Sequence, residues 1–158
     1  MDYVSKLGMK RLAKSEQSQV KRVCWKGKKC ASFYDQSLIV LEEYAGKLVI
    51  ASVAIAEGAE RKIVKASDVM EALRVVKKAH RTMADMELTL AVAPFHRLIR
   101  KSAPDQKFTK DALTLIQFEC ESYMRMLFEC ANLIAIHAGR VTLGSKDIKL
   151  AVNILSRC

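Results

Sequence analysis

The sequence lacks the features that membrane-spanning and secreted proteins need. No apolar run reaches about 18 residues without a charge, so a membrane span is not expected. No signal peptide is visible at the N-terminus. The five cysteines are an odd number. Two of them, Cys120 and Cys130, lie in an apolar segment, which favours buried thiols in a reducing compartment over disulfides. We therefore expect an intracellular protein with no membrane partner.

The motifs of common enzymes and metal sites are also absent. The chain contains no Glu-x-x-His pair, no Gly-rich phosphate loop and no nucleophile elbow. Cys24 and Cys30 lie six residues apart with no histidine nearby, which is not a spacing of zinc ligands. We therefore expect no enzymatic activity, no cofactor, no metal and no small-molecule substrate.

What the chain does have is positive charge and a large apolar fraction. Its formal net charge is +10, and residues 1–29 carry nine Lys and Arg against Asp2 and Glu16. Such an excess on a folded domain points to a polyanion, either nucleic acid or an acidic membrane. With 158 residues and 51% apolar residues, the chain can bury a core.

One long segment, residues 112–138, contains neither proline nor glycine. Its apolar residues follow the spacing of one helical face: Leu113, Ile116, Cys120, Tyr123, Leu127, Ala131, Ile134 and Ala138. A helix of this length would be about 40 Å long. It is also apolar on more than one side, so it needs two sets of packing partners.

Part of the sequence repeats. Residues 59–69 align with residues 138–148, 79 positions later, and both copies have Arg followed by Asp seven residues on (Arg61 and Asp68, Arg140 and Asp147). This indicates two equivalent supersecondary units. We expect each Arg–Asp pair to tie a loop to the following helix, and a second role for Arg140 in ligand binding stays open.

The remaining elements follow from composition and spacing. Helices are predicted over residues 5–15, 33–59, 67–78 and 95–102, with Pro94 in the first turn of the last, and a final helix begins at residue 145. Residues 17–32 are predicted to be a polar loop. Residues 79–92 are a connector whose part 83–90 has helical composition, and residues 139–142 form a strand-like loop.

Three segments closely resemble core histone three: residues 93–100, 128–142 and 146–148. Residues 12–13, 20–22 and 59–69 resemble core histone four more loosely. A fused pair in this order is similar to the histone doublets of giant DNA viruses. The chain departs from the family in having no long Lys-rich tails and in the lengths of its first loops.

The resemblance implies an all-α fold with two histone folds, each a short, a long and a short helix. The two would clasp as an intramolecular handshake pseudo-dimer. Residues 1–78 would be the histone-four-like half, 79–92 the connector and 93–158 the histone-three-like half. In such a handshake, the first loop of one half lies beside the second loop of the other.

The same resemblance implies an architectural protein that wraps double-stranded DNA in nucleosome-like particles without sequence specificity. The expected DNA contacts are Lys10, Arg11, Lys14, Lys21, Arg22, Lys28, Lys29, Arg61, Lys62, Arg97, Arg100, Lys107, Arg140, Thr142 and Lys146. Ile63 stands where histone four usually has threonine. The alternatives are a histone-fold transcription or chromatin-assembly factor subunit and, for residues 26–29, an ordinary solvated loop.

Finally, the resemblance implies self-association of the histone-three-like half across a two-fold axis. The interface would contain Cys130, Ile134, His137, Asp147, Leu150 and Ile154, with Asp147 beside His137 of the other chain. For His137, a core histidine with satisfied hydrogen bonds is the alternative. A second doublet resembling histones two-A and two-B is the implied partner. The implied location is the nucleus or viral factory of a host cell, and the virion, bound to DNA.

Overall fold

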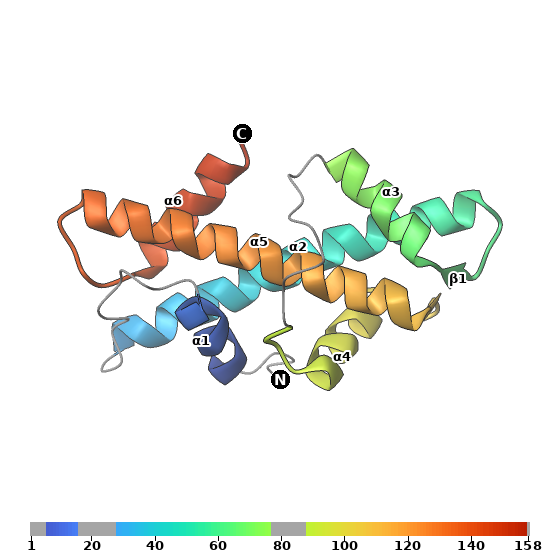
Figure 1. Ribbon diagram of the computed structural model, residues 1–158, viewed down its shortest axis with the longest axis horizontal. Helices are drawn as coiled ribbons and strands as arrows, with labels where there is room; N and C mark the ends of the chain where they lie inside the picture. Colours follow the sequence, from blue (N-terminus) through green and yellow to red (C-terminus); the bar gives the residue numbers. More distant parts are fainter. Residues whose placement is uncertain (1–5, 16–27, 77–87, 158) are drawn as a thin grey trace.

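The computed structural model describes residues 6–15, 28–76 and 88–157 (Figure 1). This part of the chain is all-α except for one pair of two-residue strands, which confirms the predicted class. The elements in chain order are α1 (Lys6–Ser15), α2 (Lys28–Gly58), β1 (Ile63–Val64), α3 (Ala66–Val76), α4 (Val92–Ser102), β2 (Lys107–Phe108), α5 (Lys110–His137) and α6 (Ser145–Leu155).

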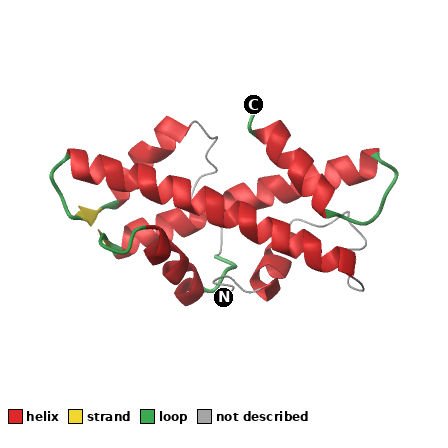
Figure 2. Cartoon of the chain, turned by 180° about the vertical axis from the view of Figure 1, so that it is seen from behind, coloured by secondary structure: helices red, strands yellow, loops and turns green. Residues whose placement is uncertain are grey.

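Two long helices, α2 and α5, cross each other and carry the short helices on two sides. Helices α1 and α4 lie on one side of the crossed pair, and α3 and α6 lie on the other (Figures 1 and 2). Each of the four short helices packs against a long helix of the other half of the chain as well as against its own. The order short, long, short therefore occurs twice, and each unit covers the other.

The core lies along the crossing of the long helices. Leu41 of α2 and Leu127 of α5 are fully buried. The rings of Tyr44 of α2 and Tyr123 of α5 stack with their centroids 4.1 Å apart. Burial of one such leucine contributes about 1.5–3 kcal/mol. The predicted stripe of α5 is buried from Ile116 to Ala131 and becomes exposed at its end, so the expected core face is confirmed.

Two predicted boundaries are wrong. Helix α2 begins at Lys28, so residues 28–32 are not loop; nothing after Gly27 breaks a helix, and the polar composition alone suggested a loop. Residues 88–90 are not helical, because the backbone N–H groups of Thr89 and Leu90 both bond the carboxylate of Glu121 in α5 instead of preceding carbonyls. Helix α4 starts at Val92, with Pro94 in its first turn as expected.

The loops of the two halves meet at one end of the molecule. Strands β1 and β2 pair in parallel, with Ile63 opposite Lys107 and Val64 opposite Phe108. This confirms the expected neighbourhood of the second loop of the front half and the first loop of the back half. The other loop pair includes residues 17–27, which lie outside the described residues. Residues 139–142 contain turns and bends but no strand, so the expected strand-like geometry is not found there.

Candidate nucleic-acid interface

Both long helices end in the same turn. Glu60 and Gly139 occupy equivalent positions and have left-handed backbones, with φ of 53° and 65°. The N–H of the next residue, Arg61 or Arg140, bonds the carbonyl five positions earlier, at 3.0 and 2.9 Å. This 6→1 bond is the Schellman ending, which satisfies late helix carbonyls and reverses the chain. It places an arginine at the third position after the end of each long helix.

Each arginine then forms a bidentate ion pair that we call an Arg–Asp clamp. Arg61 donates to the two carboxylate oxygens of Asp68 at 2.7 and 2.9 Å. Arg140 donates to those of Asp147 at 2.6 and 3.0 Å. The aspartates are buried, whereas the arginine side chains remain 32% and 43% exposed. The predicted tie between loop and helix is therefore confirmed in both copies, and part of each guanidinium faces solvent.

The aspartates also cap their helices. Asp68 accepts the N–H of Lys65 at 2.8 Å, and Asp147 accepts that of Gly144 at 2.7 Å. Both aspartates are the third residue of a helix, so each satisfies the N–H of the N-cap residue, as in one half of a capping box. The arginine hydrogen bond holds the pKa of each aspartate below its ordinary value of 3.8, although burial opposes the shift.

The paired loops form a basic edge, which we define as residues 61–65 and 103–110. Lys62, Lys65, Lys107 and Lys110 are exposed there, together with Asp105. Helix α5 also begins at this edge, where the side chain of Thr109 accepts the N–H of Ala112 at 3.3 Å. A helix N-terminus and several lysines favour bound anions. The edge therefore suits phosphate groups.

Helix α4 adds a second basic surface. Phe95, Leu98 and Ile99 are buried against the long helices. Arg97 and Arg100 are exposed, and their spacing puts them on one face of the helix. Burial lowers the pKa of the neighbouring His96, and the charge of Arg100 lowers it further. The lowered pKa favours the neutral imidazole, so the arginines supply the positive charge of this surface.

The other expected DNA contacts fall into three groups. Arg11 and Lys146 are exposed, whereas Lys10 and Thr142 are half-buried. Lys14, Lys28 and Lys29 lie in helices, but their side chains are outside the description. Lys21 and Arg22 lie outside the described residues. The fold brings Arg11, Arg97 and Arg100 to one side of the crossed helices, because α1 and α4 lie on that side (Figure 1).

The residues expected at a self-association interface are unequally accessible. His137, Leu150 and Ile154 are exposed, and Cys130 and Ile134 are half-buried. Asp147 is buried, and its oxygens accept three hydrogen bonds within the chain.

The sequence reasoning did not place Leu133, Ile136 and Val141 at this interface, although they are 66%, 51% and 65% exposed. The sequence feature that could have identified them is an apolar side chain near the end of α5 that lies outside the buried stripe. We call the exposed apolar residues of this region the α5–α6 end: Leu133, Ile136, Val141, Leu150 and Ile154.

The equivalent positions of the front half are less apolar. The residues 79 positions earlier are Ala54, Glu57, Lys62, Glu71 and Val75. Helices α5 and α6 pack against each other, and exposed apolar surface on such a pair is a candidate interaction site. The difference therefore marks the α5–α6 end as the more apolar of the two ends.

Other kinds of site find no support in the part of the chain that the structure describes. It contains no group of three His, Cys, Asp or Glu side chains able to hold a metal ion. Nor is any helix within the described ranges both long and apolar enough to cross a bilayer.

Comparison with known proteins agrees with this architecture. The family of core histone domains, which comprises histones two-A, two-B, three and four, matches residues 74–154, slightly more than half of the chain. The crystal structure of the histone from Methanopyrus kandleri is similar at 19% sequence identity and a TM-score of 0.70. That match covers 94% of this chain and 92% of the other. At this identity the likeness concerns the fold, and it includes the front half that the family match does not reach.

Proposed function

Because the chain belongs to the core histone family, we propose that it is an architectural protein that binds double-stranded DNA and wraps it in nucleosome-like particles without sequence specificity. The family match confirms that it is not an enzyme. The observation that carries the DNA proposal is the exposed basic edge of the paired loops, together with Arg97 and Arg100 of α4. Lysines and arginines of this kind contact phosphates and carry no base information.

We also propose that the chain is a doublet of a histone-four-like half, residues 1–78, and a histone-three-like half, residues 93–158, joined by residues 79–92. The repeated Arg–Asp clamps support two equivalent units. The packing of each short helix on both long helices supports an intramolecular handshake.

A partner doublet resembling histones two-A and two-B belongs to the same proposal. Met70 and Val75 of α3 are exposed and offer it a small apolar contact. The proposed location is the nucleus or viral factory of a host cell, and the virion, bound to DNA in each case.

The alternative is a histone-fold transcription or chromatin-assembly factor subunit, which would use the scaffold for protein contacts or promoter recognition. Nuclease digestion of the protein on random-sequence duplex separates the two functions. Wrapping predicts protection with a period of about 10 base pairs, because the minor groove faces the protein once per helical turn. Protection of one preferred sequence without that period would favour the alternative.

Removing two proposed phosphate contacts should weaken binding to all duplexes alike. We choose Arg97→Gln plus Arg100→Gln because both side chains are exposed and outside the clamps. The slope of log K against log salt should become shallower by about 2, since each lost contact contributes about 0.9. Fluorescence anisotropy with random duplexes at several salt concentrations measures the slope.

The matched control is Lys47→Gln plus Lys149→Gln, which removes the same charge from exposed positions on α2 and α6. Lys47 lines a groove with Val152 of α6 and Ser156, and no residue of α4 lines that groove. This variant should keep the wild-type slope. Equal slope changes in both variants would mean that only net charge matters and would refute the proposed contacts.

Cutting the connector should leave two fragments that remain bound to each other. A protease site introduced at Met83 would separate the halves covalently. Each fragment alone would lose the packing of the other half against its long helix and would expose part of the shared core, and a large exposed apolar surface favours association. The fragments should co-elute in native size-exclusion chromatography and separate in denaturant. A cooperative melt of the isolated front fragment would contradict the handshake.

A further inference from the structure

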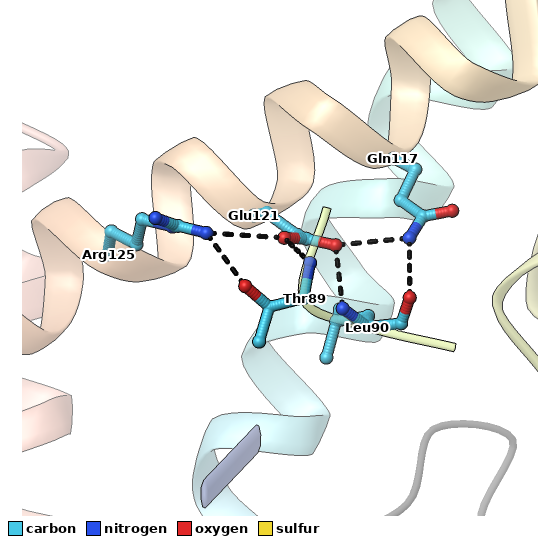
Figure 3. A network of polar contacts seen from close by, with 5 residues as sticks. All are labelled: Thr89, Leu90, Gln117, Glu121 and Arg125. Carbon is cyan, nitrogen blue, oxygen red and sulfur yellow. Dashed lines mark hydrogen bonds and ion pairs between the residues drawn. The ribbon is translucent and has the colours of Figure 1, made fainter. Parts of the chain in front are cut away.

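A buried polar network joins the end of the connector to the middle of α5 (Figure 3). Its side chains, Gln117, Glu121 and Arg125, are spaced by four residues and therefore share one face of the helix. Glu121 is 1% exposed and Gln117 is fully buried. Their partners, Thr89 and Leu90, come directly before α4. The largely apolar helix α5 thus buries a carboxylate and an amide that take no part in the Arg–Asp clamps.

The network recognises the backbone of the connector. Glu121 accepts the N–H groups of Thr89 and Leu90 at 2.8 and 2.9 Å, one on each carboxylate oxygen. Gln117 donates from Nε2 to the carbonyl of Leu90 at 2.9 Å and to Glu121 at 3.0 Å. Arg125 donates from Nη2 to the hydroxyl of Thr89 at 2.9 Å and lies 3.5 Å from Glu121. Every backbone polar group of Leu90 is therefore bound to α5.

Glu121 can remain buried only while the connector end is in place. A buried carboxylate is strongly unfavourable unless hydrogen bonds replace its water. Here two of its donors are backbone groups of residues 89 and 90, so the departure of this segment would leave the carboxylate with fewer donors. The burial of Glu121 thus favours one position of the connector end.

This position in turn controls the start of α4. The N-cap residue Ala91 makes no side-chain cap hydrogen bond. Leu90 and Phe95, which flank the cap at the positions of a hydrophobic staple, are both buried. A helix of 11 residues is stiff over its length of about 16 Å. The direction in which α4 leaves residue 90 therefore decides where Arg97 and Arg100 point.

We infer that Gln117 and Glu121 form a latch that holds the connector end on α5 and, through it, positions Arg97 and Arg100 for DNA. The latch therefore has two effects that can be tested separately. Retention of the connector end is a property of the free protein. Only the positioning of the arginines depends on the proposed DNA-binding function.

The first measurement is amide hydrogen exchange of the full chain without DNA, followed residue by residue by NMR. Glu121→Gln keeps the shape but replaces one acceptor oxygen by a donor. Exchange at Thr89 and Leu90 should become about 10- to 100-fold faster, the effect of losing hydrogen bonds to a charged group. Glu119→Gln is the matched control, because Glu119 is also buried in α5, whereas the amides of residues 89 and 90 bond Glu121. It should leave both amides as in the wild type.

Amides of α2, such as that of Leu41, distinguish local from global opening, because global unfolding accelerates them as well. If Glu121→Gln accelerates the whole core, the milder Gln117→Met decides, since it removes only the amide group that bonds Leu90. Faster exchange confined to residues 89 and 90 in either variant supports the latch. Unchanged protection at both amides in a folded variant would overturn it.

The second measurement tests positioning with a double-mutant cycle on random-sequence DNA. Arg97→Gln plus Arg100→Gln is introduced into the wild type and into Glu121→Gln. If the latch positions the arginines, removing them should cost less DNA affinity in the Glu121→Gln background. The fold-loss of affinity there should be less than half of the fold-loss in the wild type. Equal losses in both backgrounds overturn the positioning role and leave the proposed function intact. Failure of all four proteins to bind DNA would overturn the proposed function, while the exchange result would still stand.

Discussion

Replacing Asp68 and Asp147 together with alanine should remove most of the stability of the chain at neutral pH. Each aspartate accepts two hydrogen bonds from an arginine and one from the backbone of its N-cap residue. Removing one partner of a buried ion pair costs about 3–5 kcal/mol. Because the arginines here are partly exposed and can be hydrated, we expect about 2–4 kcal/mol per clamp.

The two losses should add, because the clamps follow different long helices and share no partner. Their sum of about 4–8 kcal/mol is comparable with the whole stability of a typical domain, about 5–15 kcal/mol. Urea denaturation followed by circular dichroism measures it. The control is Glu71→Ala plus Asp111→Ala, which removes the same charge from exposed positions on α3 and α5; Glu71 loses only an exposed ion pair with Arg74, which is worth about 0–1 kcal/mol. Control and clamp variants of similar stability would refute the structural role of the clamps.

The dependence on pH follows from the lowered pKa of the two aspartates. A carboxylate with a lower pKa in the folded state stabilises the fold above its unfolded pKa, near 3.8. This contribution is lost as pH falls through the folded pKa. The difference between the wild type and the double variant should therefore be full at pH 7 and shrink below about pH 4. A constant difference from pH 7 to pH 3 would mean that the carboxylate charge is not responsible.

The clamps were predictable from the sequence because all their parts are local. Arginine and aspartate occur seven residues apart in both copies, and the aspartate stands where a helix needs an N-terminal acceptor. The core stripe of α5 was predictable for a similar reason, since helical spacing selects one face. Both predictions needed only the residues of one segment.

The connector end and the α5–α6 end were not predictable in the same way. Glu121 and Gln117 are polar residues in an apolar helix, and nothing local says that they are buried by a segment about 30 residues earlier in the chain. Leu133 and Ile136 look like core residues in the sequence, yet no described element covers them. In both cases, tertiary contacts decide which side of a long helix meets water.

The α5–α6 end leads to the prediction with the largest effect on assembly. Leu150 and Ile154 are 48% and 40% exposed and share one face of α6. Leu133 and Ile136 are exposed on α5, the long helix against which α6 packs. If this end meets its own copy across a two-fold axis, every residue of the contact is used twice. Leu150→Glu plus Ile154→Glu would then place four carboxylates at the axis. Their repulsion and desolvation should split the pair of chains into single chains.

Sedimentation velocity without DNA should therefore show the mass of the assembled protein fall by half, while circular dichroism stays unchanged because these side chains are not part of the core. The variant should still bind short duplexes, since its basic edge and α4 are intact. The matched control is Met70→Glu plus Val75→Glu, which puts the same two charges on the exposed face of α3 at the other end of the molecule. It should keep the wild-type mass, because the front half has Glu71 where α6 has Leu150 and is less apolar at the equivalent positions. An unchanged mass for the Leu150 and Ile154 variant would exclude this end as the contact. Dissociation of the α3 variant alone would place the contact at the front half instead.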